Sequence, residues 1–248
     1  MEYRRFMFLA NPRVLFRMSN NESNPIRTPS FNPQVNFYVF LFPRNETSGI
    51  TRDLLYTNLT MAHYSNGQAG AFYEGNAINT RDGNFSTDYL EQGISYHAPK
   101  CFFKHTNITV REHIMHLTRE SNLDDQYETA RLTLKTDMFW QKKDPWVCKK
   151  PFGCNWLLWT PIFAPSLTVS RSFGYHYLDR LAGIRANEWD MWNFTAELAV
   201  RGPNYESFSW YFRYDYGHDY YNINFPTPIN RLQFGLCGNL NMTIKDRL

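Results

Sequence analysis

The stretch that decides the fold is "LLYTNLTMAHYSNGQ", residues 54 to 68, in which apolar and polar residues alternate. Successive side chains of a β-strand point to opposite faces, so one face collects Leu55, Thr57, Leu59, Met61, His63 and Ser65. The other face collects Tyr56, Asn58, Thr60, Ala62 and Tyr64. The pattern predicts a strand with His63 and Ser65 together on its more apolar face.

The same alternation recurs in most segments that lie between turn signals. Further strands are predicted over residues 35–42, 85–96, 130–139, 207–216 and 231–242. In several of them Arg, Lys, Asp or Gln stands on the face opposite the apolar one. The connecting segments are rich in charge, Pro or Gly, which is typical of loops. No linker or internal repeat divides the chain, so we expect residues 1–248 to form a single all-β domain.

Composition narrows the class of protein. Only 43% of the residues are hydrophobic, yet 17% are aromatic, which suits wide strand surfaces with aromatic girdles. The net charge of +3 is scattered, so nucleic acid is not an expected partner. No apolar run approaches the roughly 18 residues of a membrane-spanning helix. These features favour an antiparallel transmembrane β-barrel, and a soluble β-sandwich stays the alternative because its strands alternate in the same way.

The cysteines and the N-terminal residues give little further information about the class of protein. The four cysteines are too dispersed for a zinc site, and Cys148 and Cys154 either form a disulfide or stay as two free thiols. The opening "MEYRRFMFLANP" has no recognisable signal peptide, because its apolar part is short and no small-residue cleavage site follows. We therefore expect either that an export signal was encoded upstream or that the protein is not exported.

Three blocks of the sequence resemble segments of one known family. The block "RMSNNESNPIRTPSFNPQV" (17–35) is similar to the family's loop before a strand. The block "HYSNGQ" (63–68) is similar to its His-x-Ser-Asn-Gly active-site strand. The block "YFRYDYGHDYYNINFPTPINRLQFGLCGNLN" (211–241) resembles its last hairpin. The family that these blocks resemble is the outer-membrane phospholipase A enzymes of Gram-negative bacteria. The likeness is scattered but in register over most of the chain.

The resemblance implies an outer-membrane β-barrel of about a dozen strands that cleaves fatty acyl esters of phospholipids and depends on calcium. It implies Ser65 as the nucleophile and His63 as the general base. The third member of the triad, which orients the histidine, falls on Asp88, where the family has Asn. This departure is chemically mild, because a carboxylate accepts the imidazole N–H as an amide oxygen does.

The resemblance also implies how the developing negative charge is stabilised. The backbone N–H of Gly67 and a bound calcium ion with its waters would stabilise the oxyanion of the tetrahedral intermediate. The calcium ligands map onto the carbonyl oxygen of Gln68, onto Asn84, and onto the partner subunit's Ser23, so activity would depend on a homodimer. Calcium prefers several oxygen ligands, which these residues offer.

Two further departures from the family pattern are visible. The segment between Ser65 and Asp88 is longer than in the family, so its loop is expected to cover the site or to supply acidic ligands of its own, Glu74 and Asp82. The chain also begins near the family's third strand, so we expect an N-terminally truncated barrel.

The faces of the strands suggest where the reaction would take place. Asp88 shares a face with Leu90, Ile94 and Tyr96, and His63 and Ser65 share one with Met61, so all three are predicted to face lipid. Two rival functions remain open, a porin or adhesin barrel without catalysis and a barrel hydrolase acting on lipid A. Without the surrounding motif, His63 and Ser65 would be an ordinary polar pair near a turn.

Overall fold

The computed structural model describes residues 5–16, 29–41, 53–98, 101–114, 123, 127–141, 146–147, 158–159, 162–174, 191–201, 208–219 and 222–238. Nearly all of its regular structure is β. The strands are β1 (Phe6–Asn11), β2 (Val14–Leu15), β3 (Ser30–Phe31), β4 (Gln34–Phe40), β5 (Leu54–Ser65), β6 (Tyr73–Glu74), β7 (Ala77–Ile78), β8 (Ser86–His97), β9 (Phe103–His113), β10 (Ala130–Met138), β11 (Trp140–Gln141), β12 (Trp146–Val147), β13 (Leu158–Trp159), β14 (Ile162–Phe173), β15 (Trp192–Arg201), β16 (Phe208–His218) and β17 (Pro228–Gly238). One 3₁₀ turn, η3 (Asn222–Asn224), precedes β17.

The long strands form one antiparallel sheet in the order β1-β4-β5-β8-β9-β10-β14-β15-β16-β17. Sequence neighbours are mostly sheet neighbours, as in an up-and-down meander. The short strands β2, β3 and β11 join the same sheet, and the pairs β6–β7 and β12–β13 stand apart from it. This confirms the all-β antiparallel prediction.

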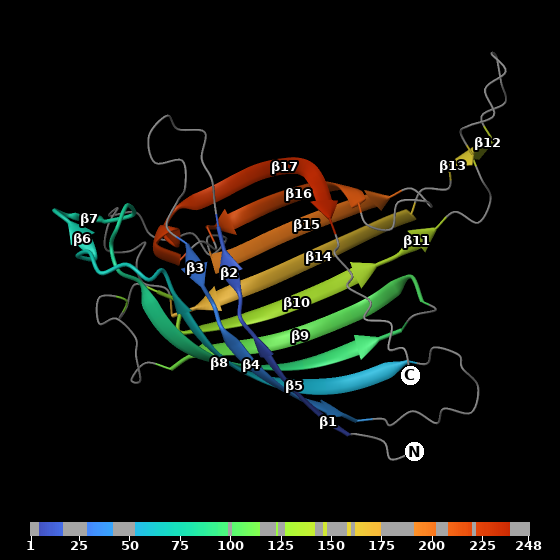
Figure 1. Cartoon of the computed structure of the whole chain (residues 1–248), viewed down its shortest axis with the longest axis horizontal. Helices are drawn as coiled ribbons and strands as arrows, with labels where there is room; N and C mark the ends of the chain where they lie inside the picture. The colour runs from blue at the N-terminus through green and yellow to red at the C-terminus, as the bar shows by residue number, and fades with distance from the viewer. Residues whose placement is uncertain are drawn as a thin grey trace, which may run out of the picture.

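The sheet curls strongly but does not close on itself within the described residues. Figure 1 shows β17 at the top and β1 at the bottom of a curved wall, and no pairing among the described residues joins these two edge strands. Hydrogen bonds nevertheless cross the hollow. The backbone N–H of Asn222, after β16, donates to the Tyr64 hydroxyl of β5 at 2.8 Å, and the Asn222 side chain donates to Ser30 Oγ at 2.8 Å.

The convex face of the sheet is mainly apolar and the concave face is mainly polar. On the convex side of β5 and β8, Met61 and Ile94 are 56% and 55% exposed, while Thr60 and Thr87 on the concave side are buried. On β17 the convex residues Leu232, Phe234 and Leu236 are also exposed. The row continues through Phe8, Phe37, Ile108, Val110, Leu132, Leu134, Phe212 and Tyr214.

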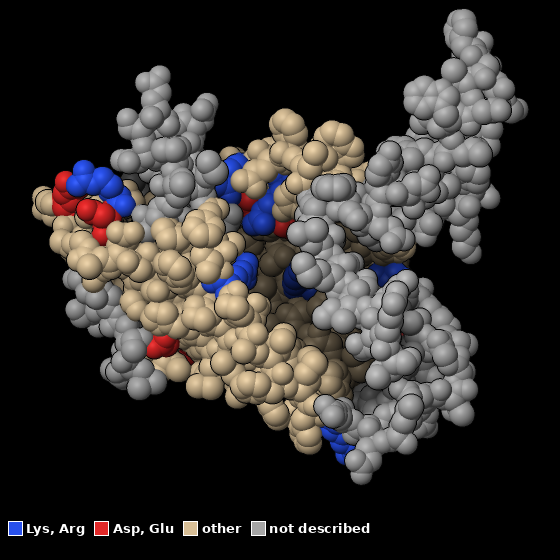
Figure 2. Space-filling view, in the orientation of Figure 1, with Lys and Arg blue, Asp and Glu red and all other residues tan. Residues whose placement is uncertain are grey.

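Charged side chains on the concave face pair with one another, either across neighbouring strands or along one strand. Arg111 binds Glu91 at 2.8 Å, and Arg213 binds Glu197 at 2.9 Å and Asp215 at 2.8 Å. In Figure 2 arginine or lysine atoms are visible in the hollow, whereas uncharged side chains cover most of the described surface that this view shows. The concave face is thus a network of paired charges and hydroxyls.

An aromatic cluster packs at the end of the hollow where β5 ends and β8 begins. Phe85 makes edge contacts with Tyr64 and Tyr127, at ring-centroid distances of 5.4 and 5.3 Å, and Phe225 closes the group. Edge-to-face packing of this kind stabilises beyond simple burial. The cluster fixes the ends of the strands that carry His63, Ser65 and Asp88.

The predicted strands agree with the observed ones to within a few residues. Residues 85–96 were predicted and β8 spans Ser86–His97, while β17 starts three residues before the predicted 231. The part of the predicted strand beyond Gly238 lies outside the described residues, as do Cys148 and Cys154. Among the described residues, no helix is long and apolar enough to cross a membrane.

Candidate active site

His63 and Asp88 form a hydrogen-bonded pair on the convex face. They are directly opposite each other in the β5–β8 register, and His63 Nδ1 lies 2.7 Å from Asp88 Oδ1. Their side chains are 40% and 23% exposed, so solvent or substrate reaches both. Met61 and Leu90, the next pair on the same face, are apolar. The prediction that imidazole and carboxylate meet on the apolar, outward face is confirmed.

Ser65 stands two residues beyond His63 on the same face, as the last residue of β5. It lies opposite Ser86 in the register and is half-buried. Among the contacts of the described residues there is no hydrogen bond between the Ser65 hydroxyl and the imidazole. When His63 Nδ1 carries the proton that Asp88 accepts, Nε2 is left as the acceptor that a serine hydroxyl needs. Catalytic hydrogen bonds are often long before substrate binds.

Gly67 is held in a backbone conformation that favours glycine. Its φ is +64°, and a Cβ there would lie 2.9 Å from the Phe31 ring. Phe31 is itself placed by strand pairing, because β3 meets β5 at the Phe31–Ser65 bridge. The chain thus turns sharply just after Ser65. The backbone N–H of Gly67 is two residues from the serine, and no side chain at position 67 shields it.

Asn66, which sequence reasoning passed over, holds both ends of the long loop together. Its Oδ1 accepts from the backbone N–H groups of Gln68 and Phe85, at 3.2 and 3.0 Å, and its Nδ2 donates to the Gly83 carbonyl at 2.6 Å. Its side chain is almost completely buried. The bridge brings Gln68 and residue 84 to the same corner of the molecule. An Asn–Gly pair after a strand predicts a turn, but it does not predict that the asparagine side chain bridges the two ends of the loop.

The predicted calcium ligands are partly brought together. Gln68 is exposed and Asn84 half-buried at the corner that Asn66 bridges, and both carry the neutral oxygens that calcium accepts. The described residues contain no group of three or more His, Cys, Asp and Glu side chains able to hold a metal. Ser23 lies outside the described residues. Gln68 and Asn84 therefore fit a calcium ion only as part of a larger ligand set.

The acidic residues of the loop are engaged within it. Asp82 Oδ1 accepts a hydrogen bond from Asn79 at 2.6 Å. Glu74, in the exposed β6–β7 hairpin, lies 3.9 Å from Arg81. Asp82 and Glu74 thus contact their own neighbours in the loop, and no contact among the described residues joins either of them to His63 or Asp88.

An apolar groove of about 570 Å³ opens beside the pair. His63 and Asp88 line it together with Ala10, Asn11, Pro12, Pro33, Gln34, Val35, Met61, Ala62, Tyr89, Leu90 and Ile114. Its volume lies within the usual range for small-molecule sites, and its wall is formed mainly by aliphatic side chains. An apolar ligand in this groove would lie within reach of the imidazole.

A second set of the same functional groups lies on the opposite face of the same strands. Thr87 Oγ1 is 3.1 Å from His113 Nδ1, and His113 Nε2 is 3.5 Å from Glu128 Oε1. Glu128 also accepts from Arg131 at 2.8 Å and from Ser172 at 2.5 Å. All of these groups except Arg131 are buried. We refer to Thr87, His113 and Glu128 as the inner cluster.

Charge pairing controls the acidity of Glu128, which precedes β10. Burial alone would raise the pKa of this carboxyl, but the positive charge of Arg131 and the contacts with His113 and Ser172 outweigh burial and hold the pKa well below its usual value. Glu128 is therefore ionised at neutral pH despite being buried.

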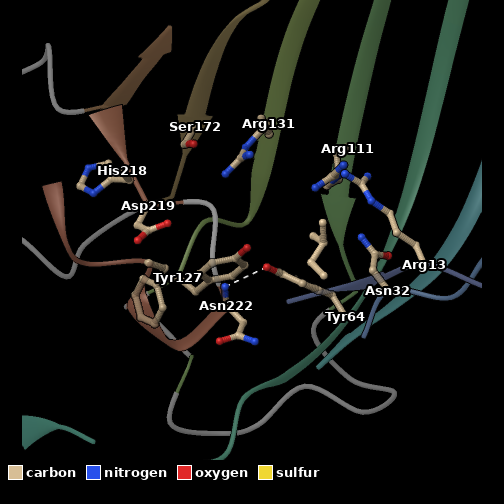
Figure 3. Close-up of a pocket in the computed structure, with 12 residues that line it drawn as sticks. Arg13, Asn32, Tyr64, Arg111, Tyr127, Arg131, Ser172, His218, Asp219 and Asn222 are labelled. Carbon is tan, nitrogen blue, oxygen red and sulfur yellow. Dashed lines mark hydrogen bonds between the residues drawn. The ribbon is translucent and has the colours of Figure 1, made fainter. Parts of the chain in front are cut away.

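A small cavity of about 130 Å³ lies inside the hollow, on the concave side. Figure 3 shows Arg13, Arg111 and Arg131 lining it, opposite Asn222, whose N–H donates to the Tyr64 hydroxyl. Tyr64 points inward whereas its neighbours His63 and Ser65 point outward. This cavity is thus separated by the sheet from the candidate active site.

Comparison of the chain with protein-family models, curated proteins and solved structures finds no match. The resemblance to outer-membrane phospholipase A therefore remains a prediction, and the function is argued below from the geometry.

Proposed function

We propose that the protein is a serine esterase that removes fatty acyl chains from phospholipids in the outer membrane. The observation that carries the proposal is the 2.7 Å pair of His63 and Asp88 on an apolar outer face, beside Ser65 and an apolar groove. The apolar side chains around the pair match a substrate that lies in a membrane, such as the acyl ester of a phospholipid, better than they match a water-soluble substrate.

The faces of the sheet support a membrane location. A transmembrane β-barrel has apolar residues outside, polar residues inside and strands of about 9–11 residues. Strands β5, β8, β9, β14, β15, β16 and β17 are 10 to 12 residues long. Most of their outward side chains are apolar, many of these are exposed, and their inward charges are paired. In water this arrangement would expose a large hydrophobic surface at high cost in free energy.

The chain's own residues account for the main steps of ester hydrolysis. His63 takes the proton of Ser65, whose oxygen attacks the ester carbonyl, and the alcohol of the lysophospholipid leaves with that proton. Water, deprotonated by His63, then releases the fatty acid from Ser65. Asp88 keeps the imidazole oriented and stabilises its protonated form. The backbone N–H of Gly67 donates to the oxyanion, where one donor is typically worth about 10²-fold or more in rate.

Calcium belongs to the proposal as a cofactor that would be held by the Gln68 carbonyl and Asn84, completed by the partner subunit's Ser23 in a homodimer. When bound, the ion supplies positive charge near the oxyanion. Calcium and the homodimer rest on the family resemblance and on the donor types at this corner.

Fatty-acid release from phosphatidylethanolamine vesicles tests the proposal. The expected result is hydrolysis by the wild-type protein in calcium, loss of hydrolysis in chelator, and loss in Ser65→Ala. Retention of full activity in Ser65→Ala would rule out the serine mechanism. Cleavage of lipid A but not of phospholipid would instead favour a lipid A hydrolase, and ion conductance without hydrolysis would favour a porin.

A further inference from the structure

Arg171 is a charged residue on the apolar outer face. On β14 it lies opposite Leu132 of β10 and Trp192 of β15, both of which point outward. Its guanidinium lies 5.4 Å from the centre of the Phe173 ring and 5.5 Å from that of Trp192. Two aromatic rings therefore flank the cation, an arrangement that stabilises and orients it.

The Arg171 side chain has no polar partner among the described residues. Its Nε–H group is buried and donates to no acceptor among these residues, and none of their ion pairs involves Arg171. On the concave face Arg111, Arg131 and Arg213 each bind a carboxylate. A buried donor without an acceptor costs about 1–3 kcal/mol, more for a charged group. None of the described residues supplies an acceptor to Arg171, so a bound ligand that does would stabilise it.

The position of Arg171 indicates which ligand this is. Trp192 is the first residue of β15, and β14 ends at Phe173, so the group lies at the rim of the sheet. Cross-strand pairs link this rim to the candidate active site, from Phe173 through Ala130 and Glu112 to Leu90, the outward neighbour of Asp88. In membrane barrels, aromatic residues and arginine at this level meet the lipid headgroups.

We propose that Arg171 binds the phosphate of a membrane lipid headgroup, with its guanidinium held between Phe173 and Trp192. The planar fork of arginine donates two parallel hydrogen bonds to phosphate oxygens. The inference rests on the membrane location proposed above, but not on catalysis. The nearest outward carboxylate on the described strands, Glu112, is two strands away, roughly 10 Å at usual strand spacing.

A lipid without ester bonds separates this site from the esterase. Native mass spectrometry of the detergent-solubilised protein counts bound molecules of dialkyl-ether phosphatidic acid, of the matching dialkylglycerol without phosphate, and of inorganic phosphate. We expect wild type to hold the ether phosphatidic acid about tenfold more tightly than Arg171→Gln does, and Arg171→Lys to lie between them. Lys104→Gln is the matched control. It also removes a cation that lies above an aromatic ring, that of Phe139, but Lys104 is near the start of β9, away from the rim that holds Arg171, so this variant is expected to bind like wild type.

Equal binding by wild type and Arg171→Gln would overturn the site, as would equal binding of dialkylglycerol and ether phosphatidic acid. If Arg171→Gln does not fold, unchanged affinity in Arg171→Lys overturns it as well. Displacement of the lipid by an equal concentration of inorganic phosphate would overturn the lipid source in favour of free phosphate. Fatty-acid release by Arg171→Gln at the wild-type kcat is expected, so failure of this site leaves the esterase proposal standing.

Discussion

Two adjacent residues of β8, Asp88 and Thr87, take part in clusters with the same functional groups on opposite faces of the sheet. Outside, Asp88 binds His63 at 2.7 Å beside Ser65, and the pair lines an open groove. Inside, Thr87 contacts His113, which contacts Glu128, and all three are buried. Connectivity of hydroxyl, imidazole and carboxylate is therefore not enough to define an active site. Access of substrate and a free imidazole nitrogen separate a reactive cluster from a structural one.

Replacing the two histidines in turn gives the largest expected contrast. His63→Gln removes the general base, so kcat for fatty-acid release should fall roughly 10⁴-fold or more, with little change in thermal stability. His113→Gln breaks buried contacts, so it should destabilise by about 1–3 kcal/mol and leave kcat of the folded protein within a few-fold of wild type. Kinetics and thermal unfolding in detergent measure both. The opposite pattern would assign the chemistry to the inner cluster.

Changes at Asp88 sharpen the role of the outer carboxylate. Asp88→Ala removes the group that orients His63 and should lower kcat by about 10³-fold. Asp88→Asn keeps an acceptor oxygen for the imidazole N–H, so we expect a loss of only about tenfold. Equal losses in Asp88→Asn and Asp88→Ala would mean that negative charge, not orientation, is what the site needs.

Two glycines with similar backbone angles test the turn after Ser65. Gly67→Ala introduces a Cβ at φ +64° that lies 2.9 Å from the Phe31 ring, whereas Gly75→Ala at φ +62° meets no atom within 4 Å. Gly75→Ala therefore reports the conformational cost alone, about 1 kcal/mol. Gly67→Ala should cost more stability and also lower kcat, because it displaces the backbone N–H beside Ser65. Identical behaviour of the two variants would remove Gly67 from the site.

The inner cluster predicts a pH effect on stability. The pKa of Glu128 is lowered by folding, so its ionisation stabilises the protein above the unfolded pKa of about 4.3, and this contribution is lost as the pH falls towards the folded pKa. Unfolding midpoints should therefore be flat near neutral pH and decline below about pH 4. Glu128→Gln should be less stable at pH 7 and show a shallower acid decline. A wild-type stability that rises on acidification would contradict this ionisation.

Alternation along single strands made much of this arrangement predictable. The period of two residues fixed which face His63, Ser65 and Asp88 share, because that parity is a local property of each strand. It also located β5, β8 and β10 closely. The β5–β8 register was beyond a local pattern, because a long loop separates the strands and the buried Asn66 bridge sets their alignment.

Other features depended on long-range contacts or broke the local rules. β14 was not singled out, and it contains Pro165, a residue that disfavours a strand interior. Glu128 of the inner cluster comes from a segment before β10 where no periodicity applies, and Ser172 reaches it from β14. The isolated position of Arg171 appears only once its neighbours on β10 and β15 are known.

Covalent labelling of the intact protein tests the central claim most directly. An alkyl fluorophosphonate with a long chain reacts with a serine hydroxyl activated by a neighbouring imidazole. Peptide mass spectrometry of the labelled protein in detergent is expected to find the adduct on Ser65, to lose it in His63→Gln, and to retain it in His113→Gln. An adduct on another residue, or labelling of Ser65 that is indifferent to His63, would contradict an outward-facing serine esterase.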